Sequence, residues 1–114
     1  MPIPEVKSWC LKNKGWFVCH IGFTWTDDHG HRIECKGDGH DICKTEKICA
    51  EPGLPPCNVP AGSLVTIYVR VDGGYNKTAH ESFIYNPNSK CTAEYEITGT
   101  TLDSNLHFLG ILCP

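Results

Sequence analysis

Residues 63–72 alternate apolar and polar side chains more cleanly than any other stretch of the chain. The apolar set is Val65, Ile67, Val69 and Val71, and the polar set is Thr66, Tyr68, Arg70 and Asp72. Strict alternation has the two-residue period of a strand that is buried on one face. Turn-forming residues precede it at 60–62 and follow it at 73–74. We therefore predict a central strand of an antiparallel sheet, with one face on the core and the other free to meet a ligand.

Eight cysteines in 114 residues are the second constraint, and they lie at Cys10, Cys19, Cys35, Cys43, Cys49, Cys57, Cys91 and Cys113. An even number of cysteines in a small domain predicts disulfides and an oxidising compartment. Structural zinc sites need cysteine pairs two to four residues apart, and this chain has none. We expect four disulfides and a secreted, extracellular protein.

The charge and hydropathy patterns exclude two classes of partner. The formal net charge is −3, and the basic residues are scattered, which argues against a nucleic-acid surface. No apolar run approaches the roughly 18 residues of a membrane span, so we expect no membrane insertion. Residues 1–4 do not resemble a secretory signal, so secretion would imply that a signal has been removed.

Further strands are predicted by the same periodicity. Residues 16–26 place Phe17, Cys19, Ile21, Phe23 and Trp25 on one inward face. Residues 27–30 are a turn with Gly30 in the left-handed region, and 31–35 pair back as a short strand. Shorter strands are expected at 81–85, 91–98 and 106–112, with a helical turn or loop at 102–105. The sheet should have about five strands, mostly antiparallel because their connections are short.

A short helix is predicted from Asp41, a plausible N-cap, to Ala50. In such a helix Cys43 and Cys49 would lie about 9 Å apart, beyond the roughly 7 Å that a disulfide allows between Cα atoms. Each cysteine would then anchor the helix to another element. The predicted fold class is α+β, with an antiparallel sheet flanked by short helices. Residues 1–8 are expected to form an extended arm, and 9–114 a single disulfide-rich, glycan-binding domain.

One short span carries the chemistry of a sugar-binding surface. Aromatic rings stack on pyranose rings, while carboxylates, amides and guanidinium groups bind hydroxyls in forked hydrogen bonds. The candidate glycan-binding residues are Tyr68, Arg70, Asp72, Tyr75 and Asn76. The alternative is an ordinary amphipathic strand with a polar outer face. Residues 76–78 also match a glycosylation sequon at Asn76.

Two other functions stay open on the residues alone. A small secreted hydrolase, of ribonuclease or glycosidase type, would use Glu94, Glu96, Arg70 and His20 if these shared one sheet face. Cross-strand pairs of Glu and Arg are, however, common surface electrostatics. A protease inhibitor would use the proline-rich loop 51–60, which Cys57 braces. No catalytic motif is present, and we expect no enzymatic activity.

The histidines invite a metal interpretation. His29 and His31 flank Gly30, with Asp27 and Asp28 beside them. This cluster is a flexible turn rather than a rigid set of ligands, so we expect a solvated turn, no metal site and no cofactor.

Several segments resemble a family of small secreted, cysteine-containing mushroom proteins with glycan-binding and immunomodulatory activity, which includes a plant-virus-inhibiting lectin of an ink-cap mushroom. The matching segments are 16–18 (Trp-Phe-Val), 22–25 (Gly-Phe-Thr-Trp), 60–65 (Pro-Ala-Gly-Ser-Leu-Val), 81–89 (Glu-Ser-Phe-Ile-Tyr-Asn-Pro-Asn-Ser) and 93–102 (Ala-Glu-Tyr-Glu-Ile-Thr-Gly-Thr-Thr-Leu). Together they cover most of the chain, but they include no residue-level binding motif.

The resemblance implies a lectin without a catalytic step. Its ligands would be N-acetylhexosamine glycans of cell-surface glycoproteins, of the fucosylated GalNAc-GlcNAc type, with antiviral, cytotoxic, apoptosis-inducing or immunomodulatory consequences. The resemblance also implies a homodimer in which two sheets join edge to edge. Such pairing would cover an exposed strand edge and make weak sugar sites bivalent.

Overall fold

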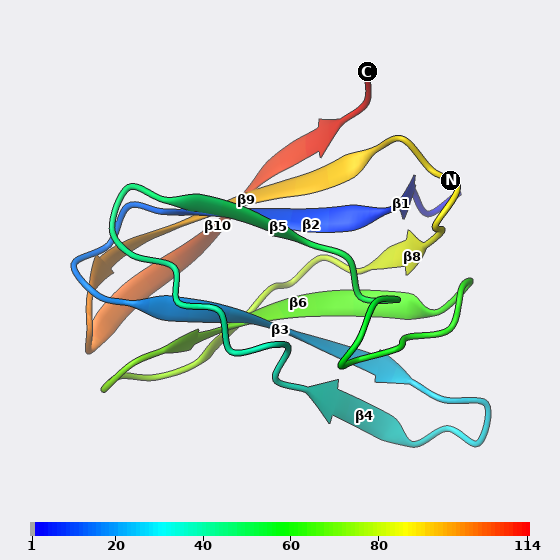
Figure 1. The fold of residues 1–114 in the computed structure, drawn as a ribbon, viewed down its shortest axis with the longest axis horizontal. Coiled ribbons are helices and arrows are strands. Elements are labelled where there is room, and N and C mark those ends of the chain that lie inside the picture. The colour runs from blue at the N-terminus through cyan, green and yellow to red at the C-terminus, as the bar shows by residue number, and fades with distance from the viewer. Residues whose placement is uncertain (1) are drawn as a thin grey trace.

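The computed structural model describes residues 2–114, and over that range the chain is a two-layer β-sandwich of ten strands without a helix (Figure 1). The first sheet has the order β1 (Glu5–Val6), β8 (Phe83–Tyr85), β6 (Leu64–Val71), β3 (Cys19–Thr26) and β4 (Arg32–Cys35), with β7 (Lys77–Thr78) also paired to β6. The second has the order β10 (Asp103–Leu112), β9 (Thr92–Thr100), β2 (Ser8–Asn13) and β5 (Lys47–Ala50). No helix that could span a membrane occurs in the described part of the chain.

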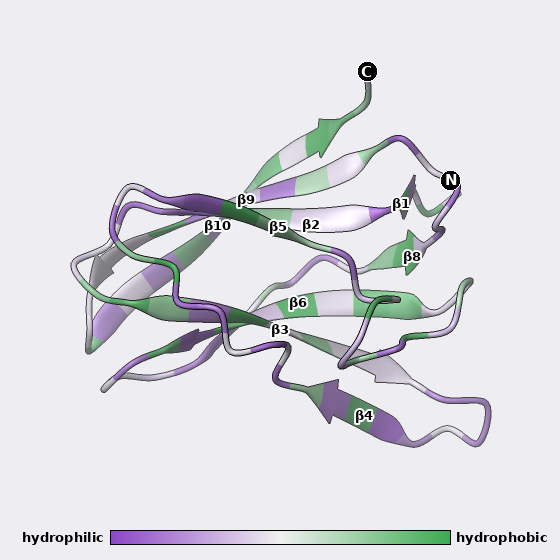
Figure 2. Cartoon of the chain, in the orientation of Figure 1, coloured by the Kyte–Doolittle hydropathy of each residue, from purple (hydrophilic) through white to green (hydrophobic). Residues whose placement is uncertain are grey.

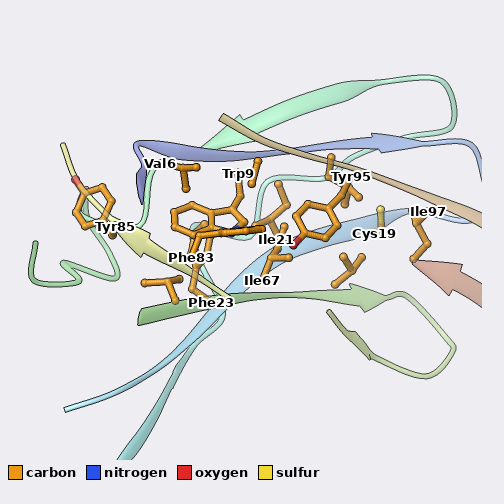
Figure 3. Packing of buried hydrophobic residues seen from close by; sticks show 14 of the residues in the cluster. Val6, Trp9, Cys19, Ile21, Phe23, Ile67, Phe83, Tyr85, Tyr95 and Ile97 are labelled. Atoms are coloured by element: carbon orange, nitrogen blue, oxygen red, sulfur yellow. The ribbon is translucent and has the colours of Figure 1, made fainter. Parts of the chain in front are cut away.

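The core lies between the two sheets (Figure 3). Val65, Ile67, Val69 and Val71 of β6 are all buried, which confirms the predicted inner face of the central strand. Trp9 of β2 packs edge-to-face on Phe23 of β3, with ring centroids 5.6 Å apart, so the largest core side chain joins the two layers. The inner faces predicted for β3 and β9 are confirmed in the same way, from Cys19 to Trp25 and from Ala93 to Ile97.

The predicted α+β class is wrong, because no helix flanks either sheet. In the segment predicted as a helix, Ile42 pairs with Cys19, residues 44–45 turn, and 47–50 form β5 beside β2. A helix of about ten residues is marginal by itself, whereas β2 offers an edge of unpaired backbone groups. A disulfide from Cys10 to Cys49 fixes β5 on that edge.

Other boundaries also differ from prediction. The sheet of about five antiparallel strands is instead two mixed sheets, in which β1 with β8 and β2 with β9 run parallel. Of the predicted arm at 1–8, residue 1 lies outside the described residues, but Val6 is fully buried and pairs with Tyr85. The segment 102–105 is not a helical turn, because β10 begins at Asp103. The predicted turn at Gly30 is confirmed by its φ of 81°.

Three disulfides form rather than the four expected: Cys10–Cys49, Cys35–Cys57 and Cys91–Cys113. The remaining two thiols, Cys19 and Cys43, are free. Cys19 points into the core, and Cys43 is exposed on the segment that pairs with it. Three cross-links are consistent with an extracellular protein.

Polar and apolar residues alternate visibly on the edge strand β4, which Figure 2 shows as purple and green bands. Arg32 and Glu34 of this strand are exposed, while Ile33 and Cys35 are half-buried against the core. The same figure shows the C-terminal end of β10 in green, where Leu109 and Leu112 remain exposed on a second edge strand.

Candidate functional site: four loops at one end of the sandwich

Four segments meet at one end of the sandwich: 14–18 between β2 and β3, 38–46 before β5, 72–76 between β6 and β7, and 99–102 between β9 and β10 (Figure 1, left). We call this surface the loop end. Backbone hydrogen bonds connect the loops, from Trp16 N–H to the Gly99 carbonyl (3.0 Å) and from Asp72 N–H to the Val18 carbonyl (3.0 Å). The loops therefore form one continuous surface.

A buried amide holds the base of this surface. Asn13, at the end of β2, is fully buried, and its Nδ2 donates to the carbonyls of Phe17 (2.7 Å) and Ile42 (2.9 Å). Its Oδ1 accepts from the backbone N–H of Gly15 (2.8 Å). One side chain thus satisfies three backbone groups that would otherwise lack partners, which fixes loop 14–18 against the segment before β5.

Large apolar side chains project from three of the four loops. The exposed fractions are 72% for Trp16, 67% for Tyr75 and 68% for Leu102. Lys44 Nζ lies 3.8 Å from the centroid of the Trp16 ring, a cation–π contact that steadies the indole without covering it. Exposed rings gathered on neighbouring loops are unusual on a small domain and mark an interaction surface.

The loops approach one another closely beside Tyr75. A Cβ on residue 74 would collide with the carbonyl oxygen of Thr101, so Gly74 is what lets the β6–β7 turn pack against the β9–β10 turn. This contact brings the loop that carries Tyr75 against the loop that carries Leu102.

A histidine between two carboxylates lies at the same end. His20 of β3 has a side chain that is only 9% exposed, and its Nε2 lies 2.8 Å from Asp72 Oδ1. Its Nδ1 faces the backbone carbonyl of His40 at 3.1 Å and Asp41 Oδ1 at 3.5 Å. The imidazole therefore joins the end of β6 to the segment before β5.

The free thiols nearby do not have the features of catalytic nucleophiles. Burial, reinforced by the negative charge of Asp72, raises the pKa of Cys19 to about 12, so this thiol stays protonated at neutral pH. A hydrogen bond with Glu46 raises the pKa of the exposed Cys43. Neither cysteine has the lowered pKa of a catalytic thiol.

The structure divides the predicted glycan-binding set. Asp72, Tyr75 and Asn76 are exposed at the loop end. Tyr68 is not available, because only 3% of it is exposed and its ring lies across Gly22, where any Cβ would collide with it. Burial raises the pKa of its hydroxyl.

Arg70 of the predicted set lies on the outer face of β6, where it is partly covered. It is half-buried, and its guanidinium reaches across β3 to the Lys36 carbonyl (3.4 Å). The outer face of β6 is thus largely occupied by its own neighbours, and the accessible groups lie beyond the strand's end.

Sequence reasoning missed several residues of the loop end. Trp16 was expected at the start of a strand that in fact begins at Cys19. Asp41 was expected as a helix N-cap, and no local pattern pairs it with His20. The usable signal was Gly15 before Trp16, since a glycine next to an aromatic residue is typical of a loop.

The predicted hydrolase set is not assembled. Arg70 and His20 belong to the first sheet, whereas Glu94 and Glu96 lie on β9 of the second. Glu94 pairs with Lys47 at 2.5 Å and Glu96 with Lys14 at 3.1 Å.

The ion pair with Lys47 favours the charged form of the Glu94 carboxylate. Burial by itself would raise the pKa of Glu94, but hydrogen bonds from Lys47 and Thr92 and the charge of Lys47 outweigh it and lower the pKa. A catalytic acid requires the opposite shift.

The loop predicted as inhibitory borders a separate cleft of about 230 Å³ on the side of the sandwich. The Cys35–Cys57 disulfide and a hydrogen bond from the Tyr85 hydroxyl to Glu51 (2.5 Å) hold the loop in place. Leu54 at its tip is exposed. The inhibitor hypothesis stays a prediction.

Comparisons with known proteins give a likeness of fold. No family model matches the chain, and no curated protein does, so the resemblance to mushroom glycan-binding proteins stays a prediction. A crystal structure described as a Gram-negative toxin is 16% identical with a TM-score of 0.51, over 90% of this chain and 22% of the toxin. This chain thus spans about a fifth of the toxin's length.

Two further solved structures were matched. Pneumolysin is 16% identical with a TM-score of 0.48, over 89% of this chain and 22% of that protein. The membrane-binding domain of pneumolysin is 20% identical with a TM-score of 0.45, over 90% of this chain and 95% of that domain.

Proposed function

We propose that this chain binds carbohydrate, without a catalytic step, through the loop end. The observation that carries the proposal is the pair of aromatic rings, Trp16 and Tyr75, that stand exposed on adjacent loops. Sugar rings present apolar C–H faces, and aromatic faces are the protein surfaces that complement them. Rings placed on a rigid scaffold lose little conformational entropy when a ligand stacks on them.

Polar groups beside Tyr75 supply the second part of sugar recognition. Asp72 and Asn76 lie in the same segment 72–76 as Tyr75, and both are exposed. A carboxylate accepts two hydrogen bonds and an amide both donates and accepts, so the pair can satisfy neighbouring hydroxyls. Asp72 Oδ1 also contacts Nε2 of His20 at 2.8 Å.

The scaffold supports a preformed site. The Cys10–Cys49 disulfide joins β2 and β5, and the ends of these strands carry loop 14–18 and the segment with Lys44. Binding residues on loops held by a rigid sheet are a common arrangement in recognition domains.

The ligand class follows from the mushroom resemblance. We propose N-acetylhexosamine glycans of cell-surface glycoproteins, of the fucosylated GalNAc-GlcNAc type, and an extracellular protein with antiviral, cytotoxic or immunomodulatory consequences. A homodimer belongs to the same proposal. The ten-residue edge strand β10, with Leu109 and Leu112 exposed, is the edge available for pairing.

A glycan array tests the ligand class, with Trp16→Ala and Tyr75→Ala as the site variants. Both side chains are largely exposed, so both variants should fold as the parent does. Leu54→Ala is the matched control, since Leu54 is 56% exposed but lies on the separate cleft. We expect the parent and the control to bind the same probes and the site variants to lose at least tenfold in affinity. Silence of the parent across N-acetylhexosamine and fucosylated probes contradicts the proposal.

A second candidate, association with a lipid surface, is favoured by Leu102. This side chain has no role in sugar recognition, and with Trp16 and Tyr75 it makes three exposed apolar groups on adjacent loops. Aromatic rings of this kind also favour a membrane interface, where one end is apolar and the other wet. Co-sedimentation with uncharged phospholipid vesicles distinguishes the two functions: Leu102→Asp abolishes lipid association but leaves sugar binding unchanged.

A further inference from the structure

We propose that His20, Asp72 and Asp41 bind one divalent transition-metal ion at the loop end. The proposal shares Asp72 with the proposed carbohydrate site, but it rests on the hydrogen-bonding capacity of the His20 ring and on the placement of two carboxylates around it, not on sugar binding. In the described part of the chain this is the group of three potential ligands whose donor atoms all lie within 4.8 Å of one another.

The first step is a count of protons on the imidazole. Nδ1 of His20 lies 3.1 Å from the His40 carbonyl, which can only accept, so this contact is a hydrogen bond only if Nδ1 carries the proton. In the neutral ring Nε2 then bears a lone pair. That lone pair lies 2.8 Å from Asp72 Oδ1, which is also an acceptor. A neutral ring carries one proton and can make only one of these two contacts as a hydrogen bond. Both are satisfied together only when the other nitrogen carries a second proton or a metal ion.

The second step is the tautomer. A metal-binding histidine usually donates its other ring N–H to a backbone carbonyl or a carboxylate, which fixes the ring and makes the ligating nitrogen more basic. The His40 carbonyl has this role toward Nδ1 of His20, and Nε2 is left facing a carboxylate. His20 is also 7% exposed and anchored in β3, so the ligating nitrogen is rigidly placed.

The third step is distance. Transition metals such as Zn²⁺ bind imidazole nitrogen and carboxylate oxygen at about 2.0–2.2 Å, which separates two tetrahedral ligands by about 3.4 Å. The Nε2 to Oδ1 distance of 2.8 Å must therefore open by about 0.6 Å. Asp72 can make this movement, because its side chain is 58% exposed.

The third ligand is Asp41. It follows His40 directly, so one segment supplies both the carbonyl that orients His20 and a second carboxylate. Asp41 Oδ1 lies 3.5 Å from Nδ1 rather than beside Nε2, so this side chain, which is 70% exposed, must turn toward Nε2 to share the ion. Two carboxylates neutralise a divalent ion, and water completes the coordination. A mixed nitrogen and oxygen set favours Zn²⁺, Co²⁺ or Ni²⁺ over Ca²⁺ and Mg²⁺, which prefer oxygen alone.

The predicted histidine turn provides the contrast. In that turn Asp27 Oδ1 accepts the backbone N–H groups of His29 (2.9 Å) and His31 (2.8 Å), so one carboxylate oxygen is occupied by its own loop, and Oδ2 lies 3.7 Å from Nδ1 of the exposed His31. Both histidines are exposed. The turn can take up metal only weakly, and it serves as the control for surface binding.

The experiment is a titration of the untagged, full-length chain with Co²⁺ and Zn²⁺, followed by calorimetry and by the visible spectrum of Co²⁺. We expect one equivalent to bind with weak visible bands typical of nitrogen and oxygen ligands, and the thermal midpoint to rise. Asp72→Asn should weaken binding about tenfold or more. The double control His29→Gln/His31→Gln should leave the affinity unchanged.

Three outcomes overturn the proposal. Absence of binding at micromolar metal means that the Nε2 contact is made by a proton. Binding that survives in Asp72→Asn but disappears in the His29/His31 control means surface uptake only. An intense sulfur charge-transfer band that is lost in Cys43→Ser means a thiolate site instead. Because His20 is buried and its substitution perturbs the core, the ring nitrogens of His20 in the parent are followed by NMR, where the Nε2 resonance should shift on addition of Zn²⁺.

Discussion

Removing the disulfide between Cys10 and Cys49 is the most informative test of how the sandwich is held together. The bond closes a loop with a sequence separation of 39 residues. In the chain-entropy description such a loop stabilises the folded state by about 3.9 kcal/mol at 25 °C, against about 3.4 kcal/mol for a separation of 22, as in Cys91–Cys113. The unfolding entropy of 114 residues is about 0.24 kcal/mol/K. Loss of the Cys10–Cys49 contribution should therefore lower the thermal midpoint by about 16 °C.

The assay is guanidinium unfolding of Cys10→Ala/Cys49→Ala and, as the control, of Cys91→Ala/Cys113→Ala, followed by near-ultraviolet circular dichroism. We expect both variants to lose several kcal/mol and the first to lose more. It also loses the loop end, because β5 is a four-residue edge strand that pairs only with β2. A loss under about 1 kcal/mol for the first variant, with native spectra retained, refutes the reasoning, since β5 would then be held by pairing rather than by the cross-link.

Three further predictions concern side chains outside that bond. Iodoacetamide should modify the native chain once, at the exposed Cys43, and should modify the buried Cys19 only after unfolding without reductant. Absence of any adduct in denaturant would mean that the chain has four disulfides. The ion pair with Lys47 lowers the pKa of Glu94, so the pair stabilises the fold above pH 4.5, the usual pKa of a glutamate, and this stabilisation is lost as the pH falls below that value. The difference in stability between the parent and Glu94→Gln, measured as urea midpoints from pH 7 to pH 3, should therefore shrink on acidification. Asn13→Ala should lower the free energy of unfolding by about 1–3 kcal/mol and should speed amide hydrogen exchange in loop 14–18. Unchanged exchange would show that the loop does not depend on this side chain.

The strands that the sequence predicted correctly are those with strict two-residue periodicity over eight or more positions. β6 is the clearest case, because every second residue from Val65 to Val71 is buried. β9 follows the same rule, whereas β3 is buried on both faces from Cys19 to Trp25, so its predicted inner face is right but its other face is covered as well. Periodicity reports which face is buried, and it reports this for each strand separately.

What periodicity does not report is the partner of each strand. β2 and β9 pair in parallel from segments more than eighty residues apart, and nothing local to either strand signals that contact. The division of the strands into two sheets was missed for the same reason. The helix predicted at 41–50 failed because Ile42 and Ile48 fit a helical stripe equally well, and the sequence does not show that 47–50 pair with β2 and are cross-linked to it by the bond from Cys49 to Cys10.

The candidate site was predicted in part. Asp72, Tyr75 and Asn76 are exposed, as the sequence suggested, because a turn follows β6. Tyr68 was misplaced because its burial depends on register: Gly22 of β3 lies directly opposite and leaves a hollow that the ring fills. Trp16 could not be paired with Tyr75 from the sequence, since their proximity depends on four loops converging at one end.

The most direct measurement of the central claim is NMR mapping of the glycan that binds best. The account predicts that the Trp16 indole N–H and the backbone amides of Tyr75 and Asn76 shift together in proportion to bound ligand, while amides around Leu54 stay unchanged. Shifts confined to the Leu54 cleft, or to the outer face of β6 around Arg70, would contradict it.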